Sequence, residues 1–136
     1  MHIEFLRLLF DFGLVILIWT VQLIIYPSFP YYGRLDLIEW HKIYVQRISY
    51  VVVPLMFGQL VVSAIQVYES QTFYTIASLI LVILVWALTF SQFVPLHHKI
   101  SNTTFTEKDV RQLIVRNWGR TILWNLIFIW GLINLF

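Results

Sequence analysis

The chain has 136 residues, of which 60% are hydrophobic and only 12% are charged, with a formal net charge of +2. A soluble domain has about 25% charged residues, so these few charges exclude a water-covered globule and predict that a lipid bilayer solvates much of the surface. The basic residues are best explained by membrane orientation, so they do not indicate nucleic-acid binding, and the absence of cysteine excludes disulfides and thiolate chemistry.

Four apolar stretches are long enough to cross a bilayer, which takes roughly 20 mostly apolar residues per helix. They are residues 8–29, 48–68, 73–96 and 119–136. The first exceeds the apolar region of a signal peptide, roughly 7–15 residues, and no small-residue cleavage site follows it, so it is expected to be retained. The sequence therefore predicts an all-α, integral membrane four-helix bundle in which residues 1–136 form one four-span domain.

The distribution of Lys and Arg predicts how this bundle is oriented. The two long connections and their flanks contain Arg34, Lys42, Arg47, Lys99, Lys108, Arg111, Arg116 and Arg120, whereas the opposite side has Arg7 alone. Basic residues favour the cytoplasmic side of a membrane. We therefore expect a multi-pass protein of the plasma or inner membrane, with cytoplasmic connections at 30–46 and 97–118 and both termini on the non-cytoplasmic side.

Both cytoplasmic connections are predicted to contain a short interfacial helix. Thr104 and Glu107 have the spacing of a capping box, which begins a helix. Apolar residues then recur at helical spacing at Val110, Leu113 and Ile114, and before the second span at Leu37, Trp40, Tyr44 and Ile48.

Polar residues within the spans are expected to face the interior of the bundle, because lipid offers them no hydrogen-bond partner. Three spans have one such face each: Asp11, Trp19, Gln22 and Tyr26; Thr75, Ser78, Thr89 and Gln92, with Trp86 beside them; and Asn117, Arg120, Thr121, Trp124 and Gly131. The second span has two candidate faces, Arg47–Tyr50–Pro54 and Gln59–Ser63–Gln66. Asp11 is interpreted as an acid near a helix N-terminus, where the helix dipole favours it.

All four spans contribute to a polar and aromatic ring at the cytoplasmic end. Its members include Tyr26, Trp40, His41, Arg47, Gln92, His97, His98, Asn117, Trp118 and Arg120. One interpretation is an interfacial belt, since aromatic and basic side chains favour headgroup depth. In that case Arg120 would bond the carbonyl of Ser91, which Pro95 leaves without its helical donor.

Two other interpretations give the ring a ligand. Imidazoles bind metals or haem, so His41, His97 and His98 are weak candidates, with Glu39 or Asp36 as an oxygen ligand. No spaced metal motif supports them, and the cofactor is unknown. The other ligand is a small aromatic or quinone-like amphiphile, whose rings suit aromatic walls and whose oxygens suit polar donors. The candidate ligand-binding residues are then Arg120, Asn117, Trp118, Arg47, Gln92, Tyr26 and Trp40, with His97 and His41 as catalytic acid or base.

Three stretches support a resemblance: WHKIYVQRISYVVVPLM, FVPLHHKI and VRNWGRTILW. From about Tyr26 to Trp124 the chain resembles the small four-helix membrane proteins of the anthrone-oxygenase-like group. The resemblance implies oxygenation of a polycyclic anthrone without an evident cofactor. It also implies that His97 or His41 is the base and that Arg120, Asn117 and Trp118 position the ligand.

A non-catalytic role stays open beside these. The chain could be a membrane partner or assembly subunit, or form a homo-oligomer, with an outer helix face docked on another protein. Scattered glycines do not form the small-residue stripe that close helix packing uses. A transporter or channel is disfavoured, because the spans lack a pair of broken helices.

Overall fold

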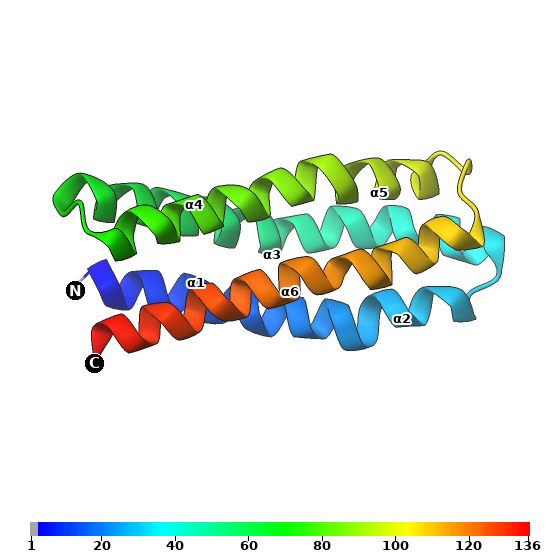
Figure 1. The fold of residues 1–136 in the computed structure, drawn as a ribbon. Helices are drawn as coiled ribbons and strands as arrows, with labels where there is room; N and C mark the ends of the chain where they lie inside the picture. Colours follow the sequence, from blue (N-terminus) through cyan, green and yellow to red (C-terminus); the bar gives the residue numbers. More distant parts are fainter. Residues whose placement is uncertain (1–2) are drawn as a thin grey trace.

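The structure, a computed structural model, describes residues 3–136, and that range is helical without strands. Four helical rods lie side by side in an elongated bundle (Figure 1). The first rod comprises α1 (Ile3–Thr20), the π-helical turn η1 (Val21–Ile25), α2 (Tyr26–Ser28) and the 3-10 turn η2 (Phe29–Tyr31). The second is α3 (Arg34–Glu69); the third comprises α4 (Phe73–Leu88), the π-helical turn η3 (Thr89–Phe93) and α5 (Val94–Ser101); the fourth is α6 (Glu107–Leu135).

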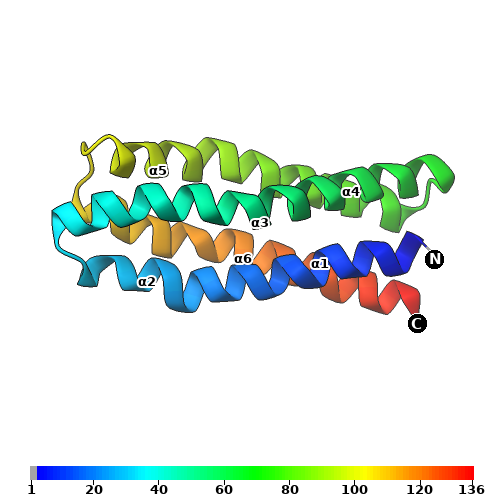
Figure 2. The same cartoon turned by 180° about the vertical axis from the view of Figure 1, so that it is seen from behind.

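The rods alternate in direction, and both termini lie at one end of the bundle (Figures 1 and 2). The connections at residues 32–33 and 102–106 lie at the other end, which we call the loop end. Three rods are long and apolar enough to cross a membrane: Ile3–Tyr31, Arg34–Glu69 and Phe73–Ser101. The all-helical fold and these three helices confirm the predicted class of membrane protein.

The surface is apolar and the interior is partly polar, the reverse of a soluble protein. Outward-facing apolar residues include Leu9, Phe57, Ile80 and Ile122, one from each rod, each more than half exposed. Buried polar residues include Asp11, His41, Gln59, Ser63, Gln66, Ser78, Asn117, Arg120 and Thr121. The predicted inward faces of the first and fourth rods are therefore confirmed, and the second rod buries Gln59, Ser63 and Gln66 while Arg47, Tyr50 and Pro54 are exposed.

The two connections differ from the prediction because no separate interfacial helix precedes the second or fourth rod. Residues 37–48 belong to α3, and residues 107–117 belong to α6. The capping box predicted at Thr104 and Glu107 is wrong. Thr103 has a left-handed φ of 64°, the turn extends through Thr104, and α6 begins at Glu107 with Thr106 as its N-cap.

The capping box that begins α6 joins Thr106 and Asp109. The backbone N–H of Thr106 donates to Asp109 Oδ2 (2.9 Å), and the backbone N–H of Asp109 donates to Thr106 Oγ1 (3.4 Å). The hydrogen bond from the Thr106 backbone lowers the pKa of Asp109 below its usual value, and the Lys99 ammonium at 3.3 Å lowers it further. An ionised carboxylate thus stabilises this helix start.

Each π-helical turn lies just before a proline. Pro27 and Pro95 have no N–H to continue an α-helical ladder. Instead, the N–H of Tyr26 donates to the carbonyl of Val21, and that of Val94 to the carbonyl of Thr89, which widens one turn of each rod. Such turns are frequent at functional sites, and both of these line the cavity described next.

Candidate functional site

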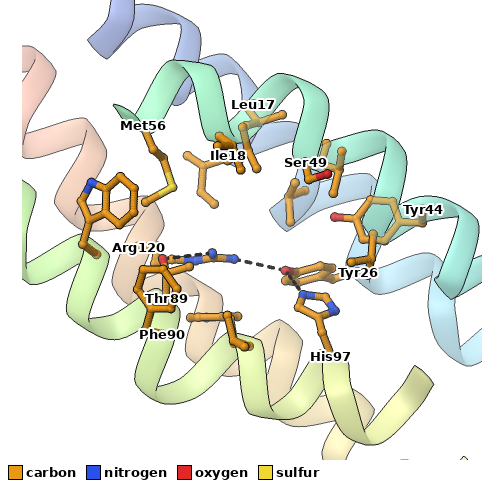
Figure 3. Close-up of a pocket in the computed structure, with 18 of the residues that line it drawn as sticks. Leu17, Ile18, Tyr26, Tyr44, Ser49, Met56, Thr89, Phe90, His97 and Arg120 are labelled. Carbon is orange, nitrogen blue, oxygen red and sulfur yellow. Dashed lines mark hydrogen bonds between the residues drawn. The ribbon is translucent and has the colours of Figure 1, made fainter. Parts of the chain in front are cut away.

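A cavity of about 310 Å³ lies between the rods in the half of the bundle nearer the loop end. Most of its wall is apolar or aromatic, with Ile18, Val21, Val52, Met56, Trp86, Phe93 and Trp124 among the lining residues. Three of its polar side chains, Arg120, Tyr26 and His97, are linked by hydrogen bonds. Figure 3 shows Arg120, Tyr26 and His97 in a row, with Leu17, Ile18 and Met56 across the cavity from them. A concave and largely apolar cavity with a few polar groups has the general form of a small-molecule site.

Arg120 is held in place by neighbours from three rods. Its Nε and Nη2 atoms donate to Asn117 Oδ1 at 3.0 and 2.7 Å, and Nη2 also donates to the Tyr26 hydroxyl at 3.1 Å. The guanidinium lies 3.5 Å from the centroid of the Phe93 ring, within cation–π range. The alternative of an Arg120–Ser91 contact is wrong, because η3 reorganises the backbone before Pro95 and the guanidinium has other partners.

No carboxylate neutralises Arg120 among residues 3–136. The two ion pairs of this range are Arg7–Asp11 and Lys99–Asp109. Arg120 is nevertheless buried, at 7% exposure. A buried cation without an anion is costly, so the wall of the cavity favours an anionic or electron-rich oxygen beside this guanidinium.

The two histidines continue the row of polar groups toward the loop end. Tyr26 Oη is 2.9 Å from His97 Nε2, His97 Nδ1 is 2.6 Å from His41 Nε2, and His41 Nδ1 is 3.2 Å from Ser101 Oγ. The imidazole rings are stacked, with centroids 4.9 Å apart and planes inclined by 24°. Since the four residues come from α2, α3 and α5, the hydrogen bonds join three of the four rods.

Further hydrogen bonds, to Gln22 and Thr121, fix Asn117 beside Arg120. Asn117 Nδ2 donates to Gln22 Oε1 at 2.9 Å, and the Thr121 hydroxyl donates to the same oxygen at 3.2 Å. Gln22 Nε2 in turn donates to the carbonyl of Ile114 at 3.1 Å. The amide of Asn117 is therefore oriented with its oxygen toward Arg120, where it accepts from Nε and Nη2 and positions the guanidinium.

Five of the residues predicted for the site lie together in the structure, and five do not. Tyr26, His41, His97, Asn117 and Arg120 form one hydrogen-bonded group. Trp40, Arg47, His98 and Trp118 are exposed, and Gln92 is half-buried outside the cavity lining. Trp118 packs edge-on against Trp19, and His98 bonds Asn102 at 2.8 Å.

Several residues of the site were not among the predicted set. Tyr44 lines the cavity three residues after His41, and Ser101 bonds His41 four residues after His97. Both follow a predicted histidine at the spacing that places residues on one helix face. That spacing could have identified Tyr44 and Ser101 from the sequence. No sequence pattern indicates Phe93, because its position under Arg120 depends on the π-helical turn.

The arrangement of the histidines does not resemble a metal centre. Among residues 3–136, no three His, Cys, Asp or Glu side chains are grouped so that they could hold an ion. His41 and His97 direct one nitrogen each at the other, at 2.6 Å. This distance suits a hydrogen bond and is too short to place an ion between the two atoms, since each Zn–N bond takes about 2.0–2.1 Å.

A second buried polar cluster occupies the end of the bundle near the termini. Arg7 Nε donates to both oxygens of Asp11, at 2.9 and 3.0 Å, and its Nη atoms donate to Gln66 Oε1 (3.0 Å) and Ser78 Oγ (2.7 Å). Gln59 bridges toward the cavity, donating to Asp11 Oδ1 at 2.6 Å and accepting from Trp124 Nε1 at 3.2 Å. Asp11 is thus half of a fully buried ion pair within α1 rather than a helix-terminal acid, and the bonds of this pair to Gln59, Gln66 and Ser78 join α1 to α3 and α4.

The fold and the site together define an all-helical membrane bundle with a polar-sided internal cavity. Comparisons with known protein families, with curated proteins and with solved structures give no match. The functional argument therefore comes from the geometry of the cavity.

Proposed function

We propose that the protein is a four-span membrane protein that binds a small aromatic or quinone-like amphiphile in the cavity and acts on it by acid–base chemistry. The observation that supports this most is the Arg120 guanidinium, buried without a carboxylate on one wall of an otherwise apolar and aromatic cavity. A planar ligand with an electron-rich oxygen would satisfy both walls, because its rings bury against aromatic side chains and its oxygen accepts from the guanidinium.

Trp86 supplies a second anchor for such a ligand. It lines the cavity, and its Nε1 is the one buried side-chain nitrogen or oxygen among residues 3–136 with no hydrogen-bond partner. Buried donors are nearly always paired in native proteins. A second oxygen on the ligand would pair it, so the cavity favours a ligand with two separated oxygens, as in a quinone or hydroxyquinone.

The ligand is proposed to enter from the bilayer. Among the lining residues, Val53, Phe90 and Val94 are also about half exposed on the outside of the bundle. They belong to α3, η3 and α5, so the cavity opens between the second and third rods, on an apolar flank. An amphiphile dissolved in lipid reaches this opening without crossing water.

The four-span topology is part of the same proposal. The outer face of α6 exposes Ile122, Leu126, Ile129 and Ile133 by half or more, which suits contact with acyl chains, so α6 is taken as the fourth span. The bias of Lys and Arg toward the loop end supports the proposal that this end lies in the cytoplasm, with the bundle in a plasma or inner membrane. Cysteines introduced at Gly33 and Asn102 should then resist an impermeant thiol reagent in intact cells, whereas ready labelling of both would reverse the orientation.

The resemblance to the anthrone-oxygenase-like group enters here as a hypothesis about chemistry. Tyr26 and His97 line the cavity and are hydrogen-bonded to each other, so they are the proposed acid and base. Anthrone and dioxygen are the substrates to try first. Oxygen uptake that depends on both protein and anthrone would support an oxygenase, and its absence would leave a binding protein of the same cavity.

Binding is tested by filling the cavity. Val52 lines it, whereas its neighbour Val51 is 49% exposed on the outer surface and does not. Val52→Phe should weaken binding of 1,4-naphthoquinone about tenfold or more, which is about 1.4 kcal/mol, and Val51→Phe should leave it unchanged. Quenching of the fluorescence of Trp86 and Trp124, both at the cavity wall, measures the affinity in detergent. Equal affinities for the two variants would show that the quinone does not occupy this cavity.

A further inference from the structure

We infer that Tyr26, His97, His41 and Ser101 form a proton-transfer chain between a ligand in the cavity and water at the loop end. The inference rests on the proposed function, since it assigns a task to the same cavity. Three contacts of 2.9, 2.6 and 3.2 Å link the four side chains in series. Tyr26 and His97 line the cavity, and Ser101 is the half-buried last residue of α5, next to the connection 102–106 (Figure 1).

Each member of the chain both donates and accepts hydrogen bonds, which is what transfer of a proton along it requires. Arg120 and Trp124, beside the inner end of the chain, do not. Arg120 only donates, so it donates to the Tyr26 oxygen and cannot take a proton onward. The indole of Trp124 is likewise a donor only, so the cluster around Arg7 and Asp11 is not connected to this chain by a proton path. The chain therefore has one inner end, at the cavity, and one outer end, at Ser101.

Two arrangements of protons satisfy all three contacts when both rings are neutral. In the first, Tyr26 donates to His97, His97 Nδ1 donates to His41, and His41 Nδ1 donates to Ser101. In the second, every bond is reversed: Ser101 donates to His41 Nδ1, His41 Nε2 to His97, and His97 Nε2 to Tyr26. One proton lies between His41 Nε2 and His97 Nδ1 in both, so the two imidazoles have the same tautomer and change it together.

One passage of a proton converts the first arrangement into the second. A hydroxyl of the ligand gives its proton to the Tyr26 oxygen while the proton of Tyr26 moves to His97 Nε2. The Nδ1 proton of His97 moves to His41 Nε2, the Nδ1 proton of His41 moves to Ser101 Oγ, and the original proton of Ser101 leaves to water. Every protein group ends neutral. The net change is the loss of one proton by the ligand, whose anion then faces Arg120 and accepts from the new hydroxyl proton of Tyr26.

This exchange restricts the chemistry the cavity would support. After one proton has moved from the ligand to water, the chain can transfer a proton only from water to the ligand. It returns to the first arrangement when a proton is given back to the ligand. The matching ligand class has an acidic phenolic or enolic hydroxyl. The matching reaction removes one proton from the ligand, holds the anion against Arg120, and later returns a proton to the product.

The surroundings of the two rings suit neutral relay groups. The other titratable or charged side chains near them are Tyr44, whose ring centroid is 6.2 and 6.3 Å from those of His41 and His97, and Arg120, which is bonded to Tyr26. Phe29 covers an edge of His41. Neither histidine belongs to an ion pair within residues 3–136, so no carboxylate fixes a proton on either ring.

The test follows a proton on a bound probe. The acid and anion of 2-hydroxy-1,4-naphthoquinone differ in visible absorbance, so a stopped-flow pH jump with protein in excess gives the rate at which the bound probe exchanges its proton with water. His41→Phe keeps a ring but removes both nitrogens, and should slow this exchange about tenfold or more while leaving the affinity for the probe within about twofold. His98→Phe is the matched control, because His98 is exposed and outside the chain, and it should exchange at the wild-type rate.

Two further measurements keep the inference open to refutation if His41→Phe does not fold. Ser101→Ala breaks the outer end of the chain and should slow the exchange in the same way. In the ¹⁵N spectrum of histidine-labelled wild type, His41 and His97 should show the same tautomer, and opposite tautomers would overturn the chain. Wild-type exchange rates in both His41→Phe and Ser101→Ala would overturn it as well, with the binding site intact. Failure of the wild type to bind the probe would instead overturn the proposed function, and this inference with it.

Discussion

Replacing Arg7 by Met should be among the most destabilising single changes in the bundle. The substitution keeps an unbranched side chain and removes a guanidinium that donates to Asp11, Gln66 and Ser78. The Asp11 carboxylate, which is fully buried, would keep only its bond from Gln59. Breaking a buried pair by removing one partner costs about 3–5 kcal/mol, and the unpaired Gln66 and Ser78 oxygens place the expected loss in the upper part of that range.

The same reasoning makes the double variant milder than the single one. Arg7→Met with Asp11→Leu removes both charges, so no ion is left uncompensated, and buried pairs replaced by apolar residues are often close to neutral. Gln59, Gln66 and Ser78 still each lose a partner, so we expect a loss of about 1–2 kcal/mol. Arg7→Met alone should lower the free energy of unfolding, and adding Asp11→Leu should raise it again. This reversal would show that the unpaired carboxylate causes the loss.

The assay is reversible unfolding by SDS in a mild detergent, followed by tryptophan fluorescence. Lys99→Met is the matched control, because the Lys99 side chain is 53% exposed and its pair with Asp109, at 3.3 Å, should contribute about 0–1 kcal/mol. If Arg7→Met cost no more than Lys99→Met, the buried cluster would not hold the rods together. If the double variant were less stable than the single one, the uncompensated charge would not be the cause of the loss.

Two further predictions concern packing and pH. Gly58→Ala would place a methyl group on the Phe10 ring and should destabilise the bundle by about 1–3 kcal/mol in the same assay. At Gly119 the nearest side-chain atom is 3.9 Å away, so Gly119→Ala should be neutral or stabilising by up to about 1 kcal/mol. Equal effects at both sites would contradict the packing argument. Because hydrogen bonding from Thr106 lowers the pKa of Asp109 in the folded state, its contribution is present above the unfolded pKa of about 3.9 and is lost as pH falls through the folded value. The wild type should therefore be more stable than Asp109→Asn at pH 7 and lose that advantage in acid, and an advantage that is the same at pH 7 and pH 3 would refute the role of the ionised carboxylate.

The sequence was sufficient to predict the long helices and most of the inward faces, because both follow from local periodicity. Asn117, Arg120, Thr121 and Trp124 recur on one face of α6, and lipid leaves such a face nowhere to point but inward. The extent of the helices was underestimated, since amphipathic first turns and apolar later turns of α3 and α6 look like two elements in sequence and form one in space.

Helical periodicity could not predict which side chains on different rods contact each other. Asp11 and Arg7 lie one helical turn apart, but charge counting assigned Arg7 to the membrane surface. The sequence indicates that Pro95 breaks the helical ladder, yet the π-helical turn before it, which brings Phe93 under Arg120, depends on how the third rod packs against its neighbours. The predicted ring of site residues therefore divides by direction rather than by depth: the residues that face the axis meet one another, and Trp40, Arg47 and Trp118 at the same level face outward.

The role of Arg120 separates into charge and shape, and two variants tested on two ligands distinguish them. Lys keeps the positive charge but has one nitrogen, which cannot contact both Asn117 and Tyr26 while a planar group stacks on Phe93, as the guanidinium does. Arg120→Lys should therefore weaken binding of 1,4-naphthoquinone and of the 2-hydroxy-1,4-naphthoquinone anion by similar factors, about tenfold each. Arg120→Met removes the charge as well, so the anion should lose about tenfold more affinity than the neutral quinone. Both variants should fold, because Asn117 is still held by Gln22. Thermal unfolding of each variant checks that the bundle is intact. If a folded Lys variant bound both quinones as the wild type does, Arg120 would be a structural residue of the bundle, and the buried cation that supports the proposed function would need no ligand to explain it.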